Sequence, residues 1–216
     1  MRQRLRADNA LRAAGLAALL VFALSGCSTT KPQPTVAGCG ADDWYFPRGT
    51  FPASYPNSDD ARRRWYSLAY IRMQELSLSC GDWTGADAYR FLWLDTFSQP
   101  ASIRITRQDN RIWLLAIRLS GTGGGDPGFV SAVVRKELPA TDWDRLAAAL
   151  QQAHFWALPT SGNMFGQHGE QWVIEGRQGT GYHVVDRWAP NQPDYRALGL
   201  LFFDLAGWPF PGIKGP

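Results

Sequence analysis

The chain is poor in the residues from which metal and catalytic centres are built. It has three cysteines and three histidines in 216 residues, and no cysteine follows Cys80. The CxxC, HExxH and GxSxG patterns of zinc sites, zinc proteases and serine hydrolases do not occur in it. These absences predict a protein without a metal ion or a cofactor, and they favour a non-enzyme over an enzyme.

The apolar stretch near the N-terminus is too short to cross a membrane. It runs from Ala13 to Leu24, whereas a membrane-spanning helix needs about 20 apolar residues. Four arginines and a single acid precede it. A basic start followed by a short apolar segment is typical of a secretory signal peptide.

The end of this segment, Leu24-Ser25-Gly26-Cys27, resembles the lipobox of bacterial lipoproteins. The resemblance implies that the Cys27 thiol carries a diacylglyceryl group and that the chain is cleaved just before it. It also implies the periplasmic face of the outer membrane, because Ser28 stands where an aspartate would favour the inner membrane. We therefore expect a signal peptide over 1–26, a lipidated cysteine with a flexible tether over 27–40, and one globular domain over 41–216.

The chain has no net charge once the predicted signal peptide is removed. The full chain has 22 basic and 19 acidic residues. Without the four Arg and one Asp of residues 1–26, 18 of each remain. A neutral domain gives no reason to expect nucleic acid as a partner.

Two cysteines remain beside Cys27, and an exported protein meets an oxidising compartment. We predict a disulfide between Cys39 and Cys80, which would stabilise the fold by about 4 kcal/mol in the simple loop-closure model. Two free thiols, or a bond between two chains, are the alternatives.

Hydrophobic periodicity predicts an α+β fold, with an antiparallel sheet of about six strands and about three helices. The expected strands are 89–94, 102–108, 111–119, 129–138, 171–175 and 182–188. Asp109-Asn110 is a hairpin signal between the second and third. The expected helices begin at Asn57 or Ser58, run from 142 to 154 after a Thr141 cap, and run from 195 to 206.

The first helix is expected to bury one apolar stripe and to expose its arginines. The three basic residues 62–64 are interpreted as a solvated surface that also pairs with Asp59 and Asp60. The apolar residues with helical spacing are Ala61, Trp65, Leu68, Ala69, Met73 and Leu76.

The glycine-rich segment 120–128 does not fit a phosphate-binding loop. No Lys-Ser or Lys-Thr follows it, and the next segment is strand-like. We expect a flexible hairpin tip.

The segment 169–188 concentrates polar residues, and it supplies the weak catalytic candidates His168, Glu170, Glu175, His183 and Asp186. A loose metal site from His168, His183 and a carboxylate, a set of Ser161 with His183 and Asp186, and a glycosidase pair of Glu170 or Glu175 with Asp186 all remain open. His168-Gly-Glu170 matches the HxE of zinc deaminases but lacks their Pro-Cys-x-x-Cys.

An ordinary hairpin explains the same polar residues. His183 and Asp186 are three residues apart, so a strand places them on opposite faces. One pairing register sets Glu175 opposite Tyr182 and Ile174 opposite His183, with a loose turn supplied by three glycines, Gly176, Gly179 and Gly181.

Segment 172–190 also resembles parts of uncharacterised exported bacterial proteins, and no function attaches to that likeness. Three functions remain. The first is a membrane-anchored envelope lipoprotein with a non-enzymatic binding or structural role, whose partner is an envelope protein or a glycan. The others are a periplasmic hydrolase using 168–188 and a glycan-binding module using exposed tryptophans. A polar concave pocket would favour the hydrolase. A row of exposed Trp would favour the glycan-binding module, and a broad apolar patch would favour a protein partner.

Overall fold

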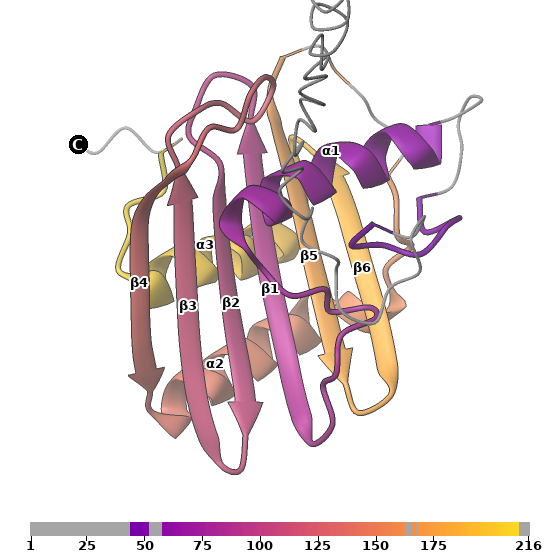
Figure 1. Cartoon of the computed structure of the whole chain (residues 1–216). Helices are drawn as coiled ribbons and strands as arrows, with labels where there is room; N and C mark the ends of the chain where they lie inside the picture. The colour runs from indigo at the N-terminus through magenta and orange to yellow at the C-terminus, as the bar shows by residue number, and fades with distance from the viewer. Residues whose placement is uncertain (1–43, 52–57, 163–165, 167, 212–216) are drawn as a thin grey trace, which may run out of the picture. The chain divides into compact units, whose positions relative to one another are not determined.

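The computed structural model describes residues 44–51, 58–162, 166 and 168–211 (Figure 1). The predicted signal peptide, Cys27 and Cys39 lie outside these residues, so the predictions made for them stay predictions. Within the described part, no helix is both long and apolar enough to cross a membrane.

The described residues form one six-stranded antiparallel sheet in the order β4-β3-β2-β1-β5-β6. The predicted α+β class is therefore confirmed, with three α-helices and a short 3-10 helix, η1, over Phe155–Ala157. The strands are β1 Ala86–Asp95, β2 Ala101–Gln108, β3 Arg111–Leu119, β4 Val130–Leu138, β5 Glu170–Gln178 and β6 Gly181–Trp188.

One face of the sheet is covered by α2 (Ala140–Gln152) and α3 (Pro193–Ala206), which lie behind the strands in Figure 1. This side holds the larger core, in which Phe91 and Trp172 pack against Phe202 and Phe203. The predicted Thr141 cap is wrong. The helix begins two residues earlier, at Ala140, Pro139 occupies the cap position, and no side chain caps it.

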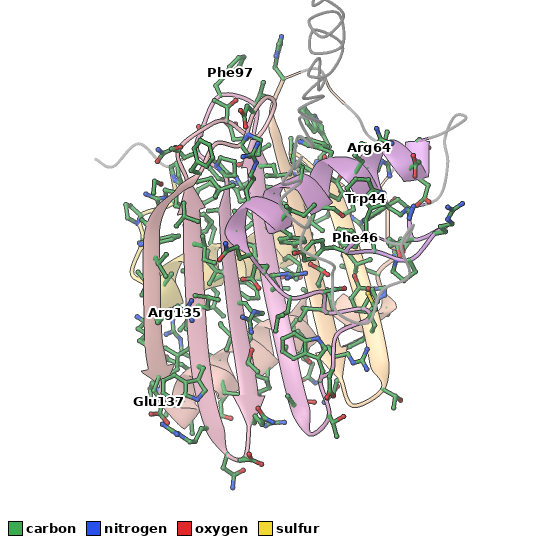
Figure 2. All side chains as sticks on the ribbon, in the orientation of Figure 1. Trp44, Phe46, Arg64, Phe97, Arg135 and Glu137 are labelled. Carbon is green, nitrogen blue, oxygen red and sulfur yellow. The ribbon has the colours of Figure 1, made fainter. Side chains whose placement is uncertain are left out.

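The other face carries α1 (Ser58–Met73), which crosses in front of β1, β5 and β6 in Figure 1. The smaller core lies here, and Tyr45, Phe46 and Phe51 from the preceding segment belong to it. The Phe46 ring packs against those of Tyr66 and Tyr70 on α1, next to the helix in Figure 2. The aromatic segment before the helix is thus ordered against the domain where it is described.

The buried stripe of α1 differs from the predicted one. Leu68 and Leu76 are exposed, and Leu76 lies beyond the end of the helix. Arg62 and Arg63 are buried instead, so the interpretation of the arginines as a solvated surface holds only for Arg64. The physical reason is that acidic side chains on the sheet and in the first helical turn compensate the buried guanidiniums. The buried residues of α1 are Ser58, Arg62, Arg63, Tyr66, Ser67, Ala69, Tyr70 and Met73.

Two hairpins test the turn predictions. Asp109 and Asn110 both have positive φ, at 49° and 61°, which is the conformation of a two-residue type I′ turn. In the β5–β6 hairpin, Glu175 lies opposite Val184, two residues from the predicted partner. This register keeps the predicted faces but moves Gly176 into the strand, so the turn is the tight pair Gly179-Thr180.

The glycine-rich segment joins β3 to β4, but it is packed rather than a flexible tip. The Gly123 N–H donates to the carbonyls of Asp95 (2.9 Å) and Ser98 (3.1 Å), and its carbonyl accepts from Trp65 Nε1 on α1 (2.7 Å). A Cβ on Gly123 would come within 2.6 Å of the Asp95 carbonyl oxygen. The glycines here permit a close approach of backbones, which the composition does not distinguish from mobility.

Candidate functional site

The five catalytic candidates do not meet at one place. Glu175 and Asp186 lie on the face that carries α1, and His183 lies on the opposite face, where its Nε2 is 3.0 Å from the Leu158 carbonyl oxygen. Glu170 accepts hydrogen bonds from Trp93 Nε1 and Arg196 Nη1 at 2.8 and 3.2 Å. The His168 ring stacks on Phe97 with centroids 5.4 Å apart.

Glu175 is the centre of a buried ion-pair network. Arg90 on β1 donates to its Oε2 through Nε (2.9 Å) and Nη2 (2.7 Å), and the side chains of both residues have no exposed surface. Tyr70 of α1 and Tyr182 of β6 donate to the two carboxylate oxygens at 2.6 and 2.9 Å. The Tyr70 hydroxyl thus attaches α1 to this carboxylate, while Arg90 and Tyr182 join it to the two neighbouring strands.

A second carboxylate extends this network to the edge of the covered region. Glu75, which follows α1, accepts from Arg90 Nη1 at 3.4 Å and from Arg104 Nε at 2.9 Å. Burial alone lowers the pKa of Arg90, but the facing Glu175, Tyr70 and Glu75 reverse the shift and hold it above its ordinary value. The guanidinium is therefore a permanent cation and offers no proton for chemistry.

Asp186 forms a separate buried cluster under the first half of α1. Its carboxylate accepts from Tyr66 Oη at 3.1 Å and Arg62 Nη1 at 3.4 Å, and Gln171 Nε2 donates to the same group. Burial raises the pKa of Asp186 to about 6, although Arg62 opposes that shift. Ser161 reaches the cluster by accepting from Arg62 Nη1 at 3.0 Å.

The hypothetical set of Ser161, His183 and Asp186 is therefore not assembled as a hydrogen-bonded relay in the described residues. Ser161 and Asp186 share Arg62, whereas His183 contacts Phe155 and Trp156 on the other face. Burial lowers the pKa of the His183 imidazole. Among the described residues there is also no group of three His, Cys, Asp or Glu that could hold a metal ion.

The α1 face is hollowed where α1 does not reach, over β2, β3 and the neighbouring part of β4. This groove has a volume of about 480 Å³. Trp113 and Leu115 contribute apolar surface, while Arg104 and Arg135 contribute positive charge. The full lining is Leu76, Asp82, Trp83, Thr84, Ala86, Arg104, Thr106, Gln108, Trp113, Leu114, Leu115 and Arg135.

Large apolar side chains are exposed on and beside this groove. Leu76, Trp113, Val130 and Val133 expose 53, 43, 45 and 47% of their surface. We call these four residues the open face. The register places Val133 opposite Ile117 and Val130 opposite Leu119, and both partners belong to the core on the α1 side. Trp83 also lines the groove but is buried, so the groove does not carry a row of exposed tryptophans.

Sequence reasoning missed the open face. The fourth strand was predicted, but nothing in its residues shows that it lies at the edge of the sheet, and Trp113 looks like any other strand tryptophan. No family model matches the chain, and no curated protein matches it.

Proposed function

We propose that the protein is a lipid-anchored lipoprotein of the bacterial envelope whose domain binds a partner protein through the open face. The observation that carries this proposal is the exposure of Leu76, Trp113, Val130 and Val133 on one side of an otherwise well-covered sheet. Large apolar side chains exposed on one face of a folded domain are typical of interaction sites.

The anchor is supported by the basic start, the short apolar segment and the sequence Leu24-Ser25-Gly26-Cys27. A single lipid group at Cys27 would place the domain at the periplasmic face of the outer membrane. Replacing Cys27 by Ala and fractionating cells tests this part. We expect the variant to leave the membrane fraction, and retention of the variant there would contradict the anchor.

A binding role is supported over hydrolysis by the way in which the acidic candidates are used. Glu175 and Asp186 are buried beneath α1, and their oxygens accept bonds from Arg90, Arg62 and tyrosines. A general acid or base has to reach a substrate atom within hydrogen-bond distance. These two carboxylates instead attach a helix.

A photocrosslinking residue at position 113 tests the partner proposal in the native envelope. We expect an adduct of increased mass with position 113 and none with the same crosslinker at Asp144, which is exposed on α2 on the other side of the sheet. Equal labelling from both positions, or from neither, would remove the open face as a binding site.

The same experiment distinguishes the glycan alternative. Trp113 lies exposed in a groove that also offers Thr106 and Gln108, and an aromatic ring beside polar groups suits a sugar. An adduct that yields peptides of a second protein by mass spectrometry indicates a protein partner, whereas one that loses its added mass on glycosidase treatment indicates a glycan and overturns the protein proposal.

A further inference from the structure

The two outer edges of the sheet differ in what covers them. At β6, the Asp186 N–H donates to the Thr160 carbonyl at 2.6 Å, and the Gly162 N–H donates to the Asp186 carbonyl at 3.3 Å. The segment 160–162 therefore pairs with that edge. Among the described residues, no segment pairs with the outer edge of β4. An open edge presents main-chain groups that accept a further strand.

The open edge carries positive charge on both faces of the sheet. Arg135 lies opposite Leu115 on the α1 side, and Lys136 lies opposite Leu114 on the side of the larger core. Both are exposed, and neither forms an ion pair within the part of the chain that the structure describes. The adjacent Glu137 does not neutralise them, because it is held by Arg111 at 3.0 and 3.1 Å.

Two valines precede these cations. Val133 is exposed on the α1 side, and Val134 lies on the other side, where it packs partly against the larger core. On each face, the edge thus presents one apolar residue followed by one cation. In Figure 2, Arg135 and Glu137 lie along β4, away from α1 and Arg64.

We propose that an extended acidic segment of the partner protein adds to β4 as a seventh strand, opposite residues 133–136. This inference rests on the proposed function and specifies the chemistry of the partner. Antiparallel pairing is the arrangement of every strand pair in the sheet. It places two adjacent acidic residues opposite Lys136 and Arg135, and two adjacent apolar residues opposite Val134 and Val133.

The charge of the edge favours this occupant over a second copy of the chain. Charged residues on an edge strand discourage pairing between like strands, and a second β4 would bring its own Arg135 and Lys136. An acidic segment faces opposite charges at both positions, and opposite-charge pairs across strands are stabilising.

The test uses the full-length chain and two labelled nine-residue peptides, Thr-Ser-Glu-Glu-Val-Val-Ser-Thr-Thr and its Lys-Lys counterpart. Fluorescence anisotropy should show about tenfold tighter binding of the acidic peptide, because its two acidic residues face two cations across the strands. The variant Arg135→Glu/Lys136→Glu should reverse the preference. The control variant Arg64→Glu changes an exposed cation on α1 and should leave it unchanged.

Hydrogen exchange locates the peptide. Slower exchange in β4 on addition of the acidic peptide supports strand addition. Three results would overturn strand addition at β4. They are equal binding of both peptides, a preference that the double variant does not reverse, and protection from exchange at β6 instead of β4. Sedimentation that shows a dimer with β4 buried assigns the edge to a second copy and overturns it as well. An adduct from position 113 without a peptide preference would retain the proposed function and remove only the acidic strand.

Discussion

The two halves of the α1 face use their residues in opposite ways. Under α1, the sheet buries charged side chains, with Arg90, Glu175 and Asp186 almost inaccessible to solvent. Beyond α1, on β3 and β4, the same face exposes Trp113 and Val133. On this face the charged residues Arg90, Glu175 and Asp186 are thus buried with the smaller apolar core, whereas Trp113 and Val133 are exposed.

The buried charged residues position α1, whereas the exposed apolar residues remain available to a partner. A buried ion pair contributes little net stability relative to apolar residues, but losing one partner is costly. The network of Arg90 and Glu175 therefore serves to define where α1 lies. The open face has no such ionic network. Its apolar side chains lower the free energy only when a partner buries them.

The largest expected effect comes from breaking the covered half. Arg90→Met leaves Glu175 buried without its cation, while Glu75 keeps Arg104, and we expect the free energy of unfolding to fall by about 3–5 kcal/mol. Urea denaturation measures it. Arg111→Met is the matched control, because its ion pair with Glu137 is solvent-exposed and its loss should change the free energy of unfolding far less. An equal loss of stability in both variants would show that burial of the ion pair does not determine its effect on stability.

The second effect depends on pH and concerns Asp186. Its pKa is raised to about 6 by burial, from an unfolded value of 3.8. The folded state therefore holds this proton more tightly, so the contribution of Asp186 to stability is full below pH 3.8 and is lost as the pH rises through 6. Between pH 4 and pH 7 the expected loss is about 2–3 kcal/mol.

Asp186→Asn removes this titration while the remaining carboxylates stay the same. We expect the stability difference between variant and wild type to move in favour of the variant as the pH rises from 4 to 7, measured by urea unfolding at each pH. A difference that does not change with pH would mean that Asp186 titrates normally.

The third effect tests the packed glycine loop that links the two halves. Gly123→Ala places a Cβ against the backbone of Asp95, and overpacking of this kind costs about 1–3 kcal/mol. Gly125→Ala, in the same loop, meets only the Thr122 hydroxyl at 3.0 Å and is the control. Thermal unfolding that is equal for the two variants would restore the flexible interpretation.

The smallest effect concerns a matched pair of valines on the same face. Val173→Thr buries an unpaired hydroxyl beneath α1 and should destabilise the protein by about 1–3 kcal/mol. Val133→Thr changes an exposed residue, and stability should stay within about 0.5 kcal/mol. If Val133→Thr also destabilises the isolated protein, the open face is already covered by the chain itself.

Sequence patterns predicted the elements better than their surroundings. The Asp109-Asn110 turn is local, because the backbone conformation of a turn depends on neighbouring residues. The orientation of α1 is not local. Arg62 is buried because Asp186, 124 residues away, compensates it, and helical spacing contains no information about that partner.

The candidate site shows the same limit. The separation of His183 and Asp186 onto opposite faces follows from strand geometry and could be predicted. The open face could not, because the exposure of Trp113 and Val133 depends on strand order and on where α1 ends. The predicted disulfide remains untested, since Cys39 lies outside the described residues.

The long sequence separations across α1 also constrain how the chain reaches its final form. Tyr70 and Arg62 find their acceptors 105 and 124 residues further along the chain. Contacts between residues so far apart in the sequence form slowly, because a long loop must close before the interaction can form. We therefore expect α1 to be fixed in place only after β5 and β6 have joined the sheet.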